Sequence, residues 1–376
     1  MTLGGLVSQM KVLRDTVNAL VFPEADREVF KGEVVAIADV LLAVDLSKGF
    51  GHFLPDEYVG YVQHIIMWLS QLQDSYNYRL NDEMAFCIRE LVAKWDSHND
   101  GRIVIFTLGD YGVRKAKRNK ITRNIDELLT ISRSTGITIT KEPVFIQVPD
   151  EFKDLIVANV VLFHEVGHFV DRDNYVTDMV YDEILPLLNK NKTSRFRREW
   201  FPRYYDVELS TVSEAETVIR NHIGEYIADV FGAQYAAEHI LCYLSFLSSK
   251  SSNDDSKDHP SLNSRKKMVE SFLDYCKLGK TDNPLLSSIL NYIPNLKTVS
   301  CPFTENELND PNLIFTDSDQ MINSFITLWS FVIRESKRAK IQKVGADNYK
   351  KVLALPYYQK LDNNIKKAIN ELKNRP

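Results

Sequence analysis

Hydrophobic residues recur at spacings of three and four positions over much of the chain, which is the period of a helix with one buried face. The pattern is clear from about residue 23 to residue 95, in FPEADREVFKGEVVAIADVLLAVD and in YVGYVQHIIMWLSQLQDSYNYRL. It ends at DSHNDG, residues 96–101, a cluster of turn-forming residues. We therefore expect a helical N-terminal region.

Two short runs rich in β-branched residues follow, and they predict strands. The first is RIVIFTLGD at residues 102–110, and the second is GITITKEPVFIQVP at residues 136–149. Pro143 divides the second run into two pieces, because proline cannot donate a hydrogen bond within a sheet. The fold class that we expect is α+β, mostly helical, with a small sheet packed on a core of two helices.

Helical periodicity then returns in two long segments. Asp150 is the expected N-cap of a helix that continues as EFKDLIVANVVLFHEVGHFVD through residue 171. Ser213 and Glu216 form a capping box ahead of VIRNHIGEYIADVFGAQYAAEHILCYLSFL, which predicts a helix through residue 247. The polar residues 248–261 predict a loop, and helical patterns follow it to residue 376.

Three regions follow from these patterns: a helical N-terminal region over residues 1–97, a central region over residues 98–280 and a helical C-terminal region over residues 281–376. Apolar residues make up 44% and charged residues 26% of the chain, as in ordinary globular proteins. The four cysteines are scattered without a CxxC pair, which predicts reduced thiols and a cytoplasmic protein. The apolar runs fall short of the roughly 20 residues that span a bilayer, so we expect no membrane span.

The sequence His164-Glu165-Val166-Gly167-His168 matches the HExxH motif inside the first of the two long helices. Positions four apart share one face of a helix, so both imidazoles can bind one zinc ion while Glu165 faces the water that zinc activates. A catalytic zinc site takes three protein ligands and keeps a position open for water or substrate. The third ligand must come from another segment.

Glu225 on the second long helix is the expected third metal ligand. Small residues on its side of the helix, with Gly167 opposite, would let the two helices approach closely around an ion. Asp229 lies one turn after Glu225, where its carboxylate can accept the free N–H of a ligating histidine as an outer partner. His222 is the alternative third ligand, and Asp171 is a less favoured candidate.

The third element of the pattern is His259-Pro260, followed by Arg265. Together, HExxH, the ExxxD of Glu225 and Asp229 and this element resemble the gluzincin metallopeptidases, in particular the HtpX and CAAX prenyl protease family. The resemblance covers residues 144–268. It implies a zincin-like metallopeptidase domain in which His259 and Arg265 are catalytic residues that bind the substrate carbonyl or its developing oxyanion. Without it, His259 is a solvated loop residue and Arg265 pairs with an acid.

The expected activity is that of a zinc-dependent metalloendopeptidase, with Glu165 as the general base and a protein or peptide as substrate. The segment VFIQVP, residues 144–149, is a candidate to pair with an extended substrate. The alternative is a non-catalytic, zinc-containing scaffold that recognises a protein partner.

A net charge of −5 disfavours nucleic acid as a partner, although basic clusters at residues 114–123 and 195–203 leave that role open. As isolated clusters, both are expected to be solvated faces of the fold. No pattern in the sequence indicates an oligomeric state.

Overall fold

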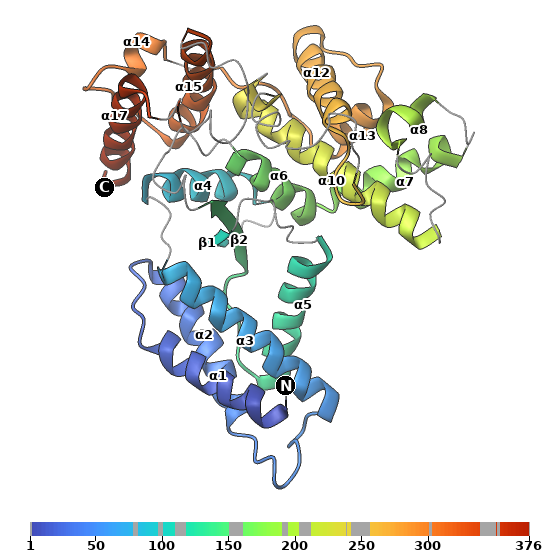
Figure 1. The fold of residues 1–376 in the computed structure, drawn as a ribbon, viewed down its shortest axis with the longest axis vertical. Coiled ribbons are helices and arrows are strands. Elements are labelled where there is room, and N and C mark those ends of the chain that lie inside the picture. Colours follow the sequence, from blue (N-terminus) through green and yellow to red (C-terminus); the bar gives the residue numbers. More distant parts are fainter. Residues whose placement is uncertain are drawn as a thin grey trace. The chain divides into compact units, whose positions relative to one another are not determined.

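The structure is a computed structural model that describes residues 2–77, 82–96, 101–109, 118–149, 161–189, 195–202, 212–237, 239–241, 256–300, 303–338, 351 and 354–375. The chain forms two compact units. The first comprises Met1–Asp82 with His98–Asp154, and the second Glu83–Ser97 with Leu155–Pro376. Helices dominate both, and the described strands form one two-stranded parallel sheet (Figure 1). The mostly helical α+β fold is thus confirmed.

The described residues of the first unit form the sheet and four helices: α1 (Leu3–Asn18), α2 (Ala25–Leu42), α3 (Pro55–Asn77), β1 (Ile103–Gly109), α5 (Arg118–Thr135) and β2 (Pro143–Pro149). Strand β1 pairs with β2 from Ile103 opposite Pro143 to Gly109 opposite Pro149. Helix α5 makes the crossover that two parallel strands require. Helix α1, which precedes the helical pattern found in the sequence, begins after Thr2, whose side chain accepts a hydrogen bond from the N–H of Gly5.

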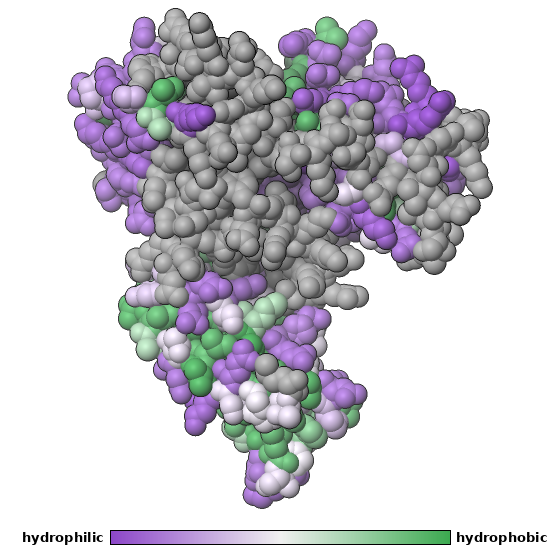
Figure 2. All heavy atoms as spheres, viewed as in Figure 1, coloured by the Kyte–Doolittle hydropathy of each residue, from purple (hydrophilic) through white to green (hydrophobic). Residues whose placement is uncertain are grey.

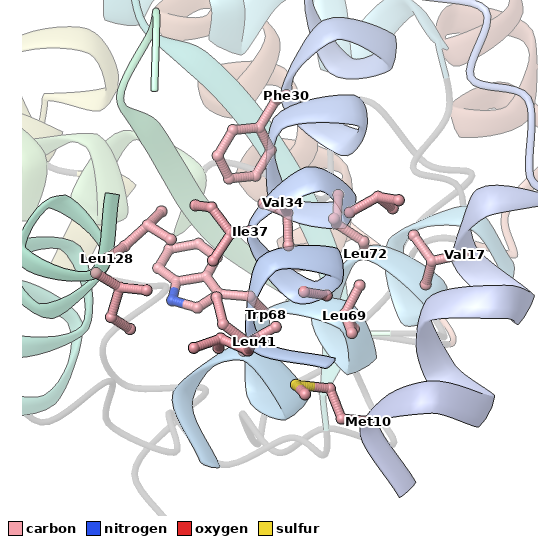
Figure 3. Close-up of a cluster of buried hydrophobic side chains, with 14 of the residues drawn as sticks. Met10, Val17, Phe30, Val34, Ile37, Leu41, Trp68, Leu69, Leu72 and Leu128 are labelled. Atoms are coloured by element: carbon pink, nitrogen blue, oxygen red, sulfur yellow. The ribbon is translucent and has the colours of Figure 1, made fainter. Parts of the chain in front are cut away.

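A hydrophobic core joins the helices of the first unit (Figure 3). Trp68 of α3 lies at its centre, with its ring edge-to-face against Phe30 of α2 at a centroid distance of 5.9 Å. Met10 of α1 and Leu128 of α5 are fully buried in the same cluster. The three- and four-residue spacing of the hydrophobic positions therefore marks the faces that pack together.

One part of the strand prediction is wrong. Residues 136–142, expected to form the first piece of the second strand, are not in a sheet. The N–H and hydroxyl of Thr140 donate instead to Oε1 of Glu33, at 3.1 and 2.7 Å. Pro143 is the first residue of β2, a position at which a strand tolerates proline.

In the second unit, every strand or helix that the described residues form is a helix. Its elements are α4 (Asp82–Trp95), α6 (Val161–Asp173), α7 (Val176–Asn189), α8 (Arg195–Trp200), α10 (Val212–Ala236), α12 (Leu262–Leu278), α13 (Pro284–Tyr292), α14 (Glu305–Leu308), α15 (Ser318–Arg338) and α17 (Pro356–Lys373). Helix α10 packs along α6 and also against α12. None of the described helices is both long and apolar enough to cross a membrane.

Two boundaries differ from the sequence patterns. Helix α4 belongs to the second unit, where Trp95 donates to the hydroxyl of Tyr235 at 2.9 Å. Helix α10 ends at Ala236 rather than continuing to residue 247, because Ala237 adopts a left-handed backbone conformation with φ of 47°. No glycine or proline marks that end. The expected N-cap Asp150, the side chain of Ser213 and residues 242–255 lie outside the described residues.

Both units expose some large hydrophobic side chains. Among the described residues, the large hydrophobic residues with more than half of their surface exposed are Val12, Val21, Val29 and Leu54 in the first unit and Tyr175 and Leu278 in the second. Figure 2 shows hydrophobic atoms interspersed with hydrophilic ones over the helices of that unit.

Candidate metal centre

Helices α6 and α10 approach closely at Gly167. A Cβ atom added to this glycine would lie 2.7 Å from the Cα of Ala228 and 2.9 Å from the Cβ of Phe231. The backbones of the two helices therefore meet with no room for a side chain on the α6 side. This contact brings the HExxH face of α6 against the Glu225 face of α10, as the small residues in the sequence predicted.

Three side chains converge at this contact. Nε2 of His164 and Nε2 of His168 lie 3.1 Å apart. Oε2 of Glu225 is 3.6 Å from the first nitrogen, and Oε1 is 3.6 Å from the second. One ligand atom from each residue can be chosen so that all three lie within 4.8 Å of one another. The group contains the two histidines and the glutamate named from the sequence.

These separations fit a divalent metal ion. Zinc bonds of about 2.0–2.1 Å in a tetrahedral site place neighbouring nitrogen and oxygen ligands about 3.3 Å apart. The observed 3.1, 3.6 and 3.6 Å, of which the last two are measured to different oxygens of Glu225, lie on either side of that value. Oε2 of Glu225 is also buried without a hydrogen bond among the residues described, and the Arg265 guanidinium lies 3.4 Å from it; a bound metal ion would supply a direct ligand bond to this oxygen. His168 keeps 33% of its side-chain surface exposed, so the centre is open on one side.

Asp229 connects the first histidine to Arg265. Oδ1 of Asp229 lies 3.0 Å from Nδ1 of His164, the nitrogen that faces away from the other two ligand candidates. Arg265 donates two hydrogen bonds to Asp229, from Nε at 2.7 Å and from an Nη atom at 2.6 Å. The same Nη atom lies 3.4 Å from Oε2 of Glu225. Arg265 is thus the pairing partner of an acid, and Asp229 lies where it can orient His164.

The residues around the centre shift the pKa values of its ionisable side chains. Burial alone would raise the pKa of the Glu225 carboxyl, but the electrostatic effect of its neighbours, His259 and Arg265 foremost, holds this pKa well below its ordinary value. Burial would likewise lower the pKa of His164, whereas Asp229 and Glu225 raise it on balance. Glu165 reaches the surface in part, yet it is surrounded closely enough for desolvation to raise the pKa of its carboxyl.

His259 reaches the centre from a short turn ahead of α12. Its Nε2 lies 3.5 Å from Oε1 of Glu225, and 26% of its side-chain surface is exposed. Pro260 follows, and Ser261 then caps α12 by accepting from the N–H of Ser264. Arg265 lies in the first turn of that helix. The His-Pro…Arg spacing therefore places the imidazole of His259 beside Oε1 and the guanidinium of Arg265 beside Oε2 of Glu225.

The two alternative ligands have other contacts. His222 is fully buried, and its Nε2 lies 2.9 Å from the carbonyl oxygen of Ser256. Asp171 accepts from the N–H and the hydroxyl of Thr177, at 2.7 and 3.0 Å, near the start of α7. The contacts of Ser256 were not anticipated from the sequence, although serine hydroxyls often hydrogen-bond the nearby backbone in turns.

The basic clusters are described only in part. The side chains of residues 114–123 and the whole of residue 203 lie outside the described residues. In α8, Arg195 is exposed and lies 3.7 Å from Glu199, which also pairs with Lys267 at 3.3 Å. Arg197 is buried. At α8 the second cluster is partly neutralised and partly packed into the fold.

Comparisons with protein-family models, with curated proteins and with solved structures found no match for this chain.

Proposed function

We propose that this protein is a zinc-dependent metallopeptidase of the gluzincin type, with His164, His168 and Glu225 as the metal ligands. The observation that carries the proposal is the convergence of these three side chains from two helices, with Glu165 beside them on α6. Glu165 favours an enzyme over a scaffold, because holding a metal requires the ligands but not the base.

Zinc bound at this centre would lower the pKa of a water molecule and polarise the carbonyl group of a substrate. Glu165 accepts the proton that the attacking water loses and later delivers it to the nitrogen of the departing amine, so that water and a peptide bond yield a carboxylic acid and an amine. Desolvation raises the pKa of Glu165, which brings it closer to the value that an acid–base catalyst needs near neutral pH.

Two further residues support the reaction in different ways. His259 lies beside Glu225 with part of its ring exposed, where Nε2 can donate to an oxygen that gains negative charge. Arg265 uses its guanidinium to hold Asp229, and Asp229 in turn orients His164. The substrate that we propose is a protein or a peptide.

The first experiment joins metal analysis to a cleavage assay. The purified protein should carry about one zinc ion per chain, as a site with three protein ligands predicts. A chelator should abolish hydrolysis of a peptide library, and added zinc should restore it. His164→Ala and His168→Ala should both lose the metal. Full occupancy in these two variants would overturn the assignment of the site.

Glu165→Gln separates the enzyme from the scaffold. Glutamine keeps the size of the side chain but cannot accept the proton. The variant should therefore bind zinc and have the same melting temperature as the parent protein, but lose nearly all hydrolysis. Zinc content, melting temperature and cleavage are measured on both proteins. Cleavage at the parent rate would show that Glu165 is not the base. An effect in cells that survives the substitution in full would favour the scaffold.

A further inference from the structure

His222 lies on α10 one turn before Glu225, and its side chain is fully buried. Its Nε2 is 2.9 Å from the carbonyl oxygen of Ser256. A carbonyl oxygen only accepts hydrogen bonds, so this nitrogen carries the proton and donates it. The protonated nitrogen has no lone pair to offer a metal. Its hydrogen bond instead ties α10 to the backbone ahead of α12.

Ser256 begins the turn that presents His259. The N–H of Ser256 donates to the carbonyl of His259 at 2.9 Å, and the Ser256 hydroxyl accepts from the N–H of His259 at 2.9 Å. These two residues close the turn from both ends. Asn221, next to His222, donates from Nδ2 to the carbonyl of Lys257 at 3.1 Å. Helix α10 therefore binds two successive carbonyl groups of the turn.

The same helix carries the residue that His259 faces. Nε2 of His259 lies 3.5 Å from Oε1 of Glu225, and Glu225 is three residues after His222. One rigid helix thus fixes both the backbone of the turn and the carboxylate beside its imidazole. Because the turn is already ordered, no further conformational entropy has to be lost to bring His259 into position. Displacement by about 1 Å from a productive position can cost about 10²-fold in rate.

We propose that His222 is a positioning residue that holds the turn of residues 256–259, through the Ser256 carbonyl, so that His259 faces the metal centre. The kinetic consequence rests on the peptidase function proposed above. The structural consequence, protection of the turn, does not depend on hydrolysis. A buried histidine that served only as packing against Phe201, with which its ring is stacked at a centroid distance of 6.4 Å, would have neither consequence.

The structural test is amide hydrogen exchange on the full-length, zinc-loaded protein, read in peptides that cover residues 256–261. His222→Leu removes the donor, whereas His222→Gln retains an N–H that can reach the same carbonyl. Exchange in the turn should be about fivefold to tenfold faster in His222→Leu, as expected for the loss of one hydrogen bond, and close to the parent rate in His222→Gln.

His239→Leu is the matched control. His239 is also a buried histidine of the second unit, and its Nε2 lies 2.7 Å from the hydroxyl of Ser330. Replacing His239 by leucine also removes a buried imidazole and one hydrogen bond, but these do not belong to the turn. This variant should keep the parent exchange rate at residues 256–261 and the parent kcat.

The kinetic test is a double-mutant cycle. His222→Leu should keep its zinc and lose about 10- to 100-fold in kcat with little change in KM, whereas in a His259→Ala background it should cost nothing further. Ser256→Ala disturbs the turn from the loop side and should reproduce the loss even if His222→Leu does not fold.

Parent-like exchange in both His222→Leu and Ser256→Ala would overturn the proposal. A loss of kcat from His222→Leu that is equally large with and without His259 would also overturn it, because His222 would then act through the fold in general. If the parent protein hydrolyses nothing, the peptidase proposal fails, and the exchange rates alone decide whether His222 holds the turn.

Discussion

Two carboxylates one turn apart on α10 have different tasks. Glu225 faces both imidazole Nε2 atoms, whereas Asp229 faces Nδ1 of His164 and the guanidinium of Arg265. The first can bind a metal directly, and the second can only act through its neighbours. Both are buried, so each requires an opposite charge within reach.

This difference predicts graded losses of metal affinity. Glu225→Ala removes a ligand and should abolish zinc binding at micromolar concentrations of metal. Asp229→Asn removes only the charge beside His164 and should weaken zinc binding by about 10- to 100-fold. Competition with a chromophoric chelator measures both values. His222→Gln is the control and should bind zinc like the parent. A larger loss in His222→Gln than in Glu225→Ala would make His222 the third ligand.

The titration of His164 predicts opposite effects of pH on the free energy of unfolding with and without metal. Without metal, a raised pKa means that His164 contributes stability below about pH 6.5, its ordinary value, and that this contribution is lost as the pH rises through the raised value. Zinc requires the neutral imidazole, so the stability that zinc supplies is lost as the pH falls.

The melting temperature should therefore differ more between zinc-loaded and chelator-treated protein at pH 8 than at pH 5.5. Thermal unfolding at several pH values measures this difference. If the difference in melting temperature stayed constant across the pH range, protonation of the ligand histidines would not compete with zinc binding.

At the scale of elements, the contact between α6 and α10 depends on Gly167. Gly167→Ala would place a Cβ atom against the backbone of Ala228, which cannot move without shifting α10. We expect a loss of about 1–3 kcal/mol in the free energy of unfolding, typical of overpacking, together with weaker zinc binding, because α10 carries Glu225. Denaturant unfolding and a zinc titration measure the two effects.

Gly232→Ala is the matched control on α10. A Cβ atom there would meet Cδ1 of Ile240 at 3.1 Å, which is the end of a flexible side chain rather than backbone. This variant should lose less stability than Gly167→Ala. The reverse order would mean that the glycine on α6 is not what sets the distance between the helices.

At the scale of the whole molecule, the candidate centre lies within one of the two units. His164, His168, Glu225, His259 and Arg265 all belong to the second unit, whereas α1, α2 and α3 share a core in the first. Removal of zinc by a chelator should therefore speed amide exchange in α6, α10 and the start of α12, and leave α1–α3 at the parent rate. Faster exchange across α1–α3 would show that the metal stabilises both units together.

Local sequence patterns were sufficient to predict much of the fold and the position of part of the candidate site. Helical periodicity predicted α2, α3 and α4, and β-branched runs predicted β1 and β2, because these signals depend on neighbouring residues along the chain. The four-residue spacing of His164 and His168 likewise places both on one face of α6 whatever packs against it. The peptidase activity, the zinc and the roles of the site residues stay predictions.

Tertiary structure decided what depends on partners distant in sequence. The sequence allowed both His222 and Glu225 as ligands, and packing brought Glu225 to the HExxH face while His222 met Ser256. Residues 136–142 had the composition of a strand, but Glu33 bound the backbone of Thr140 instead. Helix α4 follows the N-terminal helices in sequence and yet packs in the second unit. Periodicity identifies the buried face of an element, whereas the element that covers it is chosen by packing of the whole chain.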